Sequence, residues 1–486
     1  MQPKTMIFKR CADTRIIRAI NTFIESKYFI AVLAFLSLCS NVLGWELYVY
    51  TAVITMGIYL CLFARDMRVL APAVAMMYVS PSMQNNPAVN VNSIFYPDKG
   101  LGWVLAYLTV FLVLFFLRIF LSLKNKNFFT QKRKLTWGFL WLLVAFLLGG
   151  LGDKEYTILN LRYGALLFAS LFVLYYCLIA LVDWKSVPRD YFAWTGVILG
   201  LLVCFELLNI FLSGGVINLN GEINRSMIYT GWGINNNMAC VLLFCVPCAF
   251  YMAATKRKPA RYVVVATFIY LGVVFTASRN GIFMGVLIYI VSAVAALWNH
   301  KNRKENLITY GVIITIFCVF LLFATELITN LFEVLFKLGF EDNGRFQIYG
   351  EGLKQFIEKP LLGKGFYACT AYRYGTETMT FLPPRWHNTI VQMLASCGTI
   401  GFLSYLFHRF QTIKLFFRKA TLTKTFIGLC ILALLLSSVL DCHFFNIGPG
   451  LLYSIFLAFA EKDGETKWSA PLLLGASGYK HDGLTD

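Results

Sequence analysis

Long apolar runs, separated by short polar segments, make up most of the sequence. Hydrophobic residues account for 58% of the 486 residues and charged residues for only 14%, against about a quarter in soluble domains. A run of about 20 apolar residues forms a helix that crosses a bilayer with every backbone group hydrogen-bonded internally. We therefore predict an all-α polytopic membrane protein with about 12–14 transmembrane helices and one large outer loop.

The apolar runs also divide the chain. A basic segment at 1–27 precedes a transmembrane domain at 28–460, and a polar tail follows at 461–486. The runs at 69–82 and 448–460 are short for a bilayer crossing. The fourteen expected spans are 28–45, 47–63, 69–82, 102–122, 136–152, 161–182, 192–213, 236–254, 263–277, 280–298, 307–325, 387–407, 425–440 and 448–460.

The N-terminal segment is too polar for the apolar part of a cleavable signal peptide, and we expect none. It carries a stripe of apolar residues flanked by Arg15 and Arg18. This pattern is typical of a helix lying on the membrane surface, and equally of an ordinary basic cytoplasmic lead-in. The stripe consists of Ile16, Ile17, Ile20, Phe23 and Ile24.

The net charge of +18 reports membrane topology rather than a nucleic-acid partner. Most of the 43 lysines and arginines fall in alternate loops, in clusters such as Lys256-Arg257-Lys258. Loops rich in lysine and arginine remain on the cytoplasmic side of a membrane. We therefore expect both termini in the cytoplasm, and membrane lipid rather than nucleic acid around the chain. The loop 326–386 is the basic exception on the outer face.

The outer loop 326–386 is structured in part. Between Arg345 and Glu358 the apolar and polar residues alternate with helical periodicity, which predicts an amphipathic helix. Pro360 then ends the helix, and the glycines that follow supply a turn. Such a helix would form one wall of a lateral entrance for a lipid, or simply pack over the bundle.

Cationic side chains gather at the outer boundary of the predicted bundle. Arg279 stands in a tight hairpin between two spans, Arg345 opens the loop helix, and His387 opens a span. Arginine binds phosphate with two parallel hydrogen bonds and stays charged, and histidine transfers protons near neutral pH. Each residue alone has an ordinary structural reading, as a snorkelling arginine or an interfacial histidine. Arg385 and Asn388 flank His387 and favour the functional reading.

Secondary candidates are weaker. Arg225 and Glu222 lie in the outer loop 214–235 and would contact sugar or phosphate, although solvated loop charges are the commoner case. Asp441 ends a span and would orient His387 or bind an acceptor, and Glu206 stands in mid-span, where a carboxylate is costly. The 13 cysteines are mostly within spans, and we expect no metal site and no cofactor.

The ordered motifs over 231–407 resemble the O-antigen ligase and polymerase superfamily of membrane glycosyltransferases. Asn280 departs from that pattern, where many members have a small residue, and the expected span count exceeds the twelve or so usual there. The matching pieces are a Gly/Asn-rich turn at Gly231 to Asn237, Ser278-Arg279-Asn280-Gly281, Gly344-Arg345 leading to Pro360-Leu361-Leu362-Gly363-Lys364-Gly365, and His387-Asn388 before Gly398-Thr399-Ile400-Gly401.

The resemblance implies a metal-independent glycosyltransferase in the bacterial cytoplasmic membrane, acting on its outer face. It assigns binding of the donor diphosphate to Arg279 and Arg345 and activation of the acceptor to His387. The implied donor is an undecaprenyl-diphosphate-linked glycan, and the acceptor is a glycan or a lipid-linked acceptor. A chain-length regulator or a flippase is a further candidate partner.

Several functions remain open at this point. Within glycosyl transfer, polymerisation of repeat units is modestly favoured over ligation of a finished glycan. A flippase for lipid-linked oligosaccharide is the alternative, and Glu206 and Arg118 favour it because transporters place charges within the membrane. No internal repeat supports that alternative. A non-catalytic scaffold in a polysaccharide assembly complex is the third hypothesis.

Overall fold

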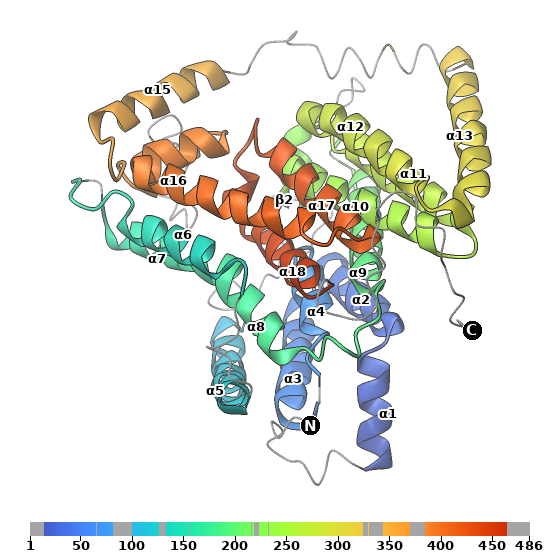
Figure 1. The fold of residues 1–486 in the computed structure, drawn as a ribbon, viewed down its shortest axis with the longest axis horizontal. Helices are drawn as coiled ribbons and strands as arrows, with labels where there is room; N and C mark the ends of the chain where they lie inside the picture. The colour runs from blue at the N-terminus through green and yellow to red at the C-terminus, as the bar shows by residue number, and fades with distance from the viewer. Residues whose placement is uncertain are drawn as a thin grey trace.

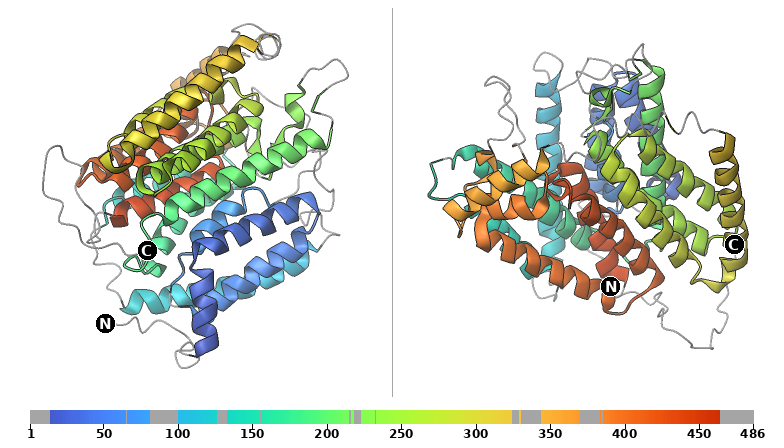
Figure 2. Two further views of the ribbon diagram at one scale, coloured as in Figure 1. Left: turned by 90° about the vertical axis from the view of Figure 1, so that its right-hand side faces the viewer. Right: turned by 90° about the horizontal axis from the view of Figure 1, so that it is seen from above.

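The computed structural model describes residues 14–64, 66–80, 100–125, 133–154, 156–214, 216–217, 223–231, 233–323, 329, 344–369, 383 and 385–463. These residues form an almost wholly helical bundle (Figures 1 and 2). The one sheet among them is a ribbon of β1 (Tyr229–Thr230) and β2 (Gly233–Ile234), paired antiparallel. The predicted fold class, an all-α polytopic membrane protein, is therefore confirmed.

A helix lies at each of the fourteen expected positions. Eight helical stretches in the described part of the chain are long and apolar enough to cross a membrane: α3 (Glu46–Phe63), α5 (Leu101–Asn125), α7 to α8 (Ile158–Leu181), α9 (Tyr191–Leu212), α10 (Asn235–Thr255), α12 (Arg279–Ala296), α13 (Arg303–Phe323) and α16 (Thr389–Phe417). The others are the shorter α2 (Lys27–Val42), α4 (Leu70–Met76), α6 (Thr136–Leu148), α11 (Pro259–Phe275), α17 (Leu422–Ser437) and α18 (Ile447–Asp463).

The expected span at 69–82 is wrong as a single membrane helix. Its helix, α4, has only 7 residues, a length of about 10 Å. The helix ends inside the bundle. Side chains of α2 donate hydrogen bonds to carbonyls at and beyond the end of the helix, as membrane-buried backbone requires. These bonds run from Ser37 to Met76 at 2.6 Å, from Asn41 to Val79 at 2.9 Å and from Ser40 to Ser80 at 2.9 Å.

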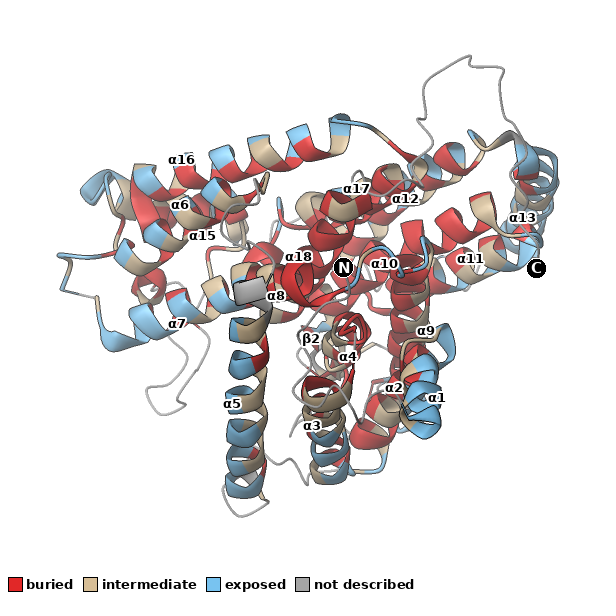
Figure 3. Ribbon diagram, turned by 60° about the horizontal axis from the view of Figure 1, so that its bottom comes forward, coloured by how far each residue is buried: buried red, intermediate tan, exposed pale blue. Residues whose placement is uncertain are grey.

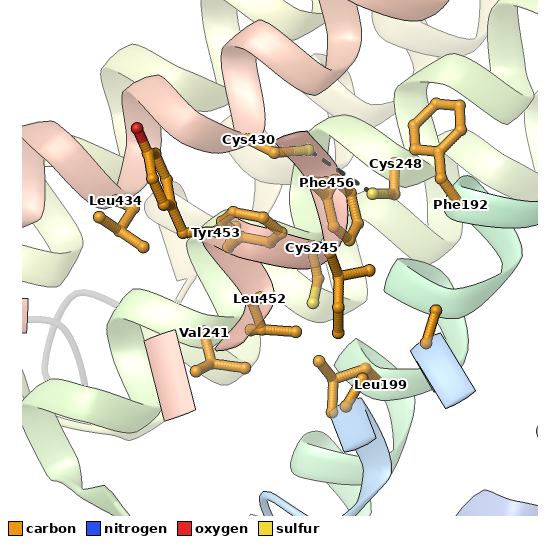
Figure 4. Close-up of a cluster of buried hydrophobic side chains, with 14 of the residues drawn as sticks. Phe192, Leu199, Val241, Cys245, Cys248, Cys430, Leu434, Leu452, Tyr453 and Phe456 are labelled. Atoms are coloured by element: carbon orange, nitrogen blue, oxygen red, sulfur yellow. Dashed lines mark hydrogen bonds between the residues drawn. The ribbon is translucent and has the colours of Figure 1, made fainter. Parts of the chain in front are cut away.

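The helix α10 lies at the centre of the bundle. Almost all of its residues are buried (Figure 3), as expected for a helix that is apolar on every side. It packs against α9, α11, α12 and α17. Figure 4 shows part of this core, where Cys245 and Cys248, three residues apart on α10, lie among apolar side chains. The Sγ of Cys248 is 3.6 Å from that of Cys430, and both thiols are free.

Two helices extend beyond the predicted spans. The span expected at 387–407 continues as α16 to Phe417, because its polar residues find partners inside the bundle. Nε2 of His408 is 2.9 Å from the hydroxyl of Tyr453, and the Arg409 guanidinium packs 4.9 Å from the same ring. Similarly, α18 continues to Asp463, since Glu461 is buried and hydrogen-bonded to Tyr175. Residues 461–463, expected as the start of the tail, thus belong to α18.

Two predicted amphipathic helices are present. The N-terminal stripe forms α1 (Arg15–Ile24), which meets α2 at an angle of 69°. The loop helix α15 has the predicted bounds, Arg345–Glu358. Residues 1–13 of the predicted basic segment and 464–486 of the predicted tail lie outside the described residues. Most of the remaining loop 326–386 lies outside them as well.

Gly398 breaks α16 and lets another segment pack into the break. Its φ of 63° and ψ of −160° are open only to glycine. The Pro360 and Leu361 carbonyls accept hydrogen bonds from Thr399 N at 2.8 Å and Ile400 N at 3.2 Å, while Lys364 N donates to Ala395 O at 2.8 Å. The turn after α15 and the start of α16 thus form one backbone-bonded unit.

We predict that Gly398→Ala destabilises this unit. A Cβ at this position would stand 2.3 Å from the Leu361 carbonyl oxygen, and the backbone conformation itself costs a non-glycine residue about 1–3 kcal/mol. The thermal unfolding midpoint of the detergent-solubilised protein should therefore fall. Gly311→Ala is the matched control, because a Cβ at Gly311 meets nothing within 4 Å. An equal midpoint for the two variants would contradict the prediction.

Candidate active site

His387 and Asp441 meet where α16 begins. The side chain of Asn388 caps α16, accepting hydrogen bonds from Ile390 N at 2.8 Å and Val391 N at 3.1 Å. Its amide also donates to Val439 O at 2.8 Å, which ties the start of α16 to the loop after α17. This arrangement brings Nδ1 of His387 to 3.2 Å from Oδ1 of Asp441. His387 itself has a φ of 49°, which is unusual for a non-glycine residue.

Asp441 is a buried carboxylate with several donors around it. Cys442 N donates to Oδ1 at 2.8 Å, and Nδ2 of Asn236 donates to Oδ2 at 3.2 Å. Nε2 of His443 lies 4.0 Å from Oδ2. Burial raises the pKa of Asp441, but His443, His387 and the Cys442 amide outweigh it, and the net pKa is lower than usual. Asp441 is therefore held in its charged form.

A short hydrogen-bonded chain links Asp441 to Ser278, the residue before Arg279. Oδ1 of Asn236 accepts a bond from the Ser278 hydroxyl at 2.8 Å. Oγ of Ser278 in turn accepts from Gly281 N at 3.2 Å and caps α12, whose first residue is Arg279. Asn280, the departure from the family pattern, donates to Ser437 O at 3.0 Å and joins α12 to α17. The Ser-Arg-x-Gly turn is thereby fixed beside the Asp441 loop.

Arg225 lies near Arg279. Burial lowers the pKa of Arg225, and the positive charge of Arg279 lowers it further. Two like charges that are brought together in a partly buried place suit an anion, because an anion relieves both the repulsion and the desolvation. The loop candidate Glu222 lies outside the described residues.

Arg345 and Arg385 act electrostatically on the same buried histidine. Burial lowers the pKa of His443, Asp441 opposes this, and Arg385, His387 and Arg345 lower the pKa again. His443 is therefore neutral at pH 7, and four predicted site residues lie within electrostatic reach of it. Arg385 also interacts with the hydroxyl of Tyr163 on α7.

The loop helix α15 is held against α16 by a buried tryptophan. Trp386 has no exposed surface and packs with Ile348 and Val391. A Cβ at Gly352 would stand 2.5 Å from Val391 and 3.1 Å from the Trp386 ring, so the two helices approach as closely as glycine allows. The Tyr349 hydroxyl donates to the His387 carbonyl at 3.0 Å. Arg345, at the first turn of α15, is positioned by these contacts.

The structure thus relates each predicted residue to its neighbours. His387 contacts Asp441 and Asn388 donates to Val439 O, so these bonds join the start of α16 to the loop after α17. Electrostatic proximity relates Arg225 to Arg279, and Arg345 and Arg385 to His443. Glu206 lies apart, buried in α9, where its side chain interacts with that of Asn209.

Four polar residues of the site carried no predicted role: Asn236, Asn237, His443 and Asn446. Asn237 accepts from Asn446 Nδ2 at 2.6 Å and contacts Nδ1 of His443 at 3.1 Å, and Asn236 bridges Asp441 and Ser278. The available signal was a run of three asparagines directly before an apolar span, since an amide at that depth needs a partner. His443 follows Asp441 by two residues, and a polar side chain so close to an apolar span likewise needs a partner.

Comparison with known proteins identifies part of this region. A family model described as "O-Antigen ligase" matches residues 262–406. The matched stretch contains Arg279, Arg345, Arg385 and His387, and ends before Asp441. No curated protein matches the chain significantly. The resemblance noted over residues 231–407 is confirmed within this matched stretch.

We predict that acid destabilises the protein through His443. Because the folded pKa lies below the unfolded value of about 6.5, only the unfolded chain gains a proton between the two values. The stabilisation from neutral His443 is therefore complete above that unfolded value and is lost as pH falls toward the folded pKa. The thermal midpoint should drop between about pH 7.5 and about pH 5.5, and drop less in His443→Gln. Equal drops in both proteins would count against this origin.

Proposed function

We propose that the protein transfers glycans from a polyprenyl-diphosphate carrier to an acceptor hydroxyl, since residues 262–406 match the family model described as "O-Antigen ligase". The observation that carries this proposal is the His387–Asp441 contact at 3.2 Å, beside His443, on which the charges of Arg345 and Arg385 act. A base held by a buried carboxylate beside cations suits a reaction with a hydroxyl nucleophile and an anionic leaving group.

The arginines receive the donor in this proposal. A diphosphate carries two to three negative charges. Further negative charge develops on its leaving oxygen as the bond to the sugar breaks. Arg279 and Arg345, from the first turns of α12 and α15, bind the two phosphates and stabilise that charge. Arg225, close to Arg279, and Arg385, close to Tyr163, contact the phosphate or the first sugar.

His387 is the general base. Asp441 accepts a hydrogen bond from Nδ1–H of His387, which leaves Nε2 as the acceptor. Nε2 takes the proton of the acceptor hydroxyl as that oxygen bonds to the anomeric carbon. The bond from the anomeric carbon to the diphosphate oxygen breaks, and the diphosphate leaves with the electron pair. Asp441 remains charged throughout and stabilises the imidazolium.

The acceptor decides between two related reactions. Attack by a hydroxyl of a second lipid-linked repeat unit extends a polymer, and attack by a different acceptor lipid ligates a finished glycan. We favour the polymerase, modestly, because ligation requires a specific acceptor lipid. In a deletion strain, single repeat units without long chains indicate a polymerase. Full-length chains that remain on the carrier lipid indicate a ligase.

The flippase alternative loses one of its two supporting residues. The Arg118 guanidinium donates to the carbonyls of Leu60, Cys61 and Ala64, at 3.2, 3.0 and 2.7 Å, so it caps the end of α3. This charge needs no transported substrate to explain it. Glu206, a carboxyl group buried within α9, remains as the observation that favours transport. A flux assay in vesicles separates the two readings, because a flippase moves lipid-linked glycan without forming a glycosidic bond.

We predict that His387→Ala lowers the rate of glycan transfer by about 10²–10⁴-fold, the usual contribution of a general base. The measurement is transfer by purified protein in vesicles that contain lipid-linked donor. Asp441→Asn should also lower the rate, because it removes the charge that orients Nδ1–H. Arg303→Ala, exposed at the opposite end of the bundle, is the matched control. Near-normal transfer by His387→Ala would overturn the assignment of the base, whereas a non-catalytic scaffold would show no transfer by the purified wild-type protein.

We also predict that transfer continues when divalent metal is removed, because arginines take the place of a metal at the diphosphate. Purified protein should keep its rate within about twofold after treatment with a chelator such as EDTA. The Arg279→Ala protein should be inactive with and without added Mg²⁺. Loss of activity on chelation, restored by Mg²⁺, would contradict the prediction, because it would show that transfer requires a metal ion.

A further inference from the structure

A cavity lies at the far end of α16 from His387. It has a volume of about 310 Å³ and opens between the start of α6 and the last turns of α16. Most of the residues that line it are basic or aromatic, and one amide and Leu415 complete the lining. They include Lys134, Phe407, Phe410, Gln411, Lys414 and Arg418.

The two kinds of residue are arranged in order along α16. The residues at 407, 411, 414 and 418 follow the three- and four-residue spacing of one helix face. Phe407 and Phe410 come first, toward the middle of the helix, and both expose their rings. Lys414 and Arg418 come last, at the helix end, and both are exposed. An apolar patch that changes to a cationic one within two turns is complementary to an amphiphile with an anionic head.

The cavity walls are fixed by side-chain hydrogen bonds. Oε1 of Gln411 accepts from Gly138 N at 2.8 Å, which joins α16 to α6. The buried Lys424 donates to Leu415 O at 3.3 Å and Arg418 O at 2.8 Å, and so holds the last turn of α16. The shape of the cavity therefore does not depend on a ligand.

Two carboxylates near these cations are already engaged. Glu461 accepts from the Tyr175 hydroxyl and from Lys134 N, and Asp463 accepts from the Thr421 hydroxyl. Both carboxylates attract the Lys424 ammonium group, whereas Lys134 and Lys419 repel it. The cations Lys134, Lys414 and Arg418 consequently outnumber the acidic groups, and the cavity has a positive field.

We propose that this cavity binds an anionic membrane phospholipid, with its phosphate on Lys134, Lys414 and Arg418 and its acyl chain along Phe407 and Phe410. The charge pattern of the sequence predicts that this end of the bundle faces the cytoplasm, where anionic headgroups attract basic residues. Free phosphate would use the cations alone and leave the aromatic half unoccupied. The site is separate from the proposed catalytic residues and does not rest on them.

The test is lipid binding by the full-length detergent-solubilised protein, followed by native mass spectrometry. The probes are dioctanoyl phosphatidylglycerol, dioctanoyl phosphatidylcholine and inorganic phosphate. Wild type should bind the phosphatidylglycerol and hardly the other two. In the triple variant Lys134→Gln/Lys414→Gln/Arg418→Gln, affinity should fall about 100-fold, since each cation near a lipid surface contributes about fivefold. Phe407→Ser/Phe410→Ser keeps every charge and should also weaken lipid binding.

The matched control is Lys301→Gln/Arg303→Gln/Lys304→Gln, which removes three exposed cations and adjoins no part of the cavity. It should retain wild-type affinity. Equal losses in the two triple variants would reduce the site to general electrostatic attraction and overturn the proposal. Tight binding of inorganic phosphate, or of phosphatidylcholine, would overturn it as well. An unchanged thermal midpoint without lipid confirms that the cavity variants are folded.

Discussion

The buried carboxylate of Asp441 joins the parts of the site. It contacts His387 before α16, Asn236 at the start of α10, and through Asn236 the Ser278 cap of α12. A charge buried beside apolar helices is costly unless donors surround it. The loop after α17 can therefore occupy only the place where these donors converge. The positions of the three helix starts, and with them Arg279 on α12, depend on that one group.

The helices were predictable because apolar length and helical period are local properties. Each expected span corresponds to a helix, and the bounds of α15 followed from its amphipathic pattern. Errors arose where partners distant in sequence satisfy polar groups. The sequence of 408–417 reads as a loop because His408 and Arg409 are polar, yet Tyr453 lies beside both in the fold. At 69–82 the serines of α2 permit a short helix and a turn.

The candidate site was predictable in its residue types but not in its connections. His387 and the arginines stand out, because charge at a membrane boundary is rare and motif spacing singled them out. Asn236, Asn237 and His443 are inconspicuous in sequence, since their role is to bond to groups up to 209 residues away along the chain. A single sequence contains no information on such pairings. The cavity at the far end of α16 was missed for the same reason, because Lys134 lies far along the chain from Lys414.

The break at Gly398 has a consequence for protein engineering. Since the turn at 360–365 is bonded to the backbone on either side of that break, and Trp386 is enclosed by α15, the outer loop and the start of α16 are not independent modules. A chimera that takes its substrate preference from a relative by exchanging only 344–369 would pair mismatched surfaces. Exchange of 344–401 as one block keeps the contacts among α15, the turn at 360–365 and the start of α16 within a single parent.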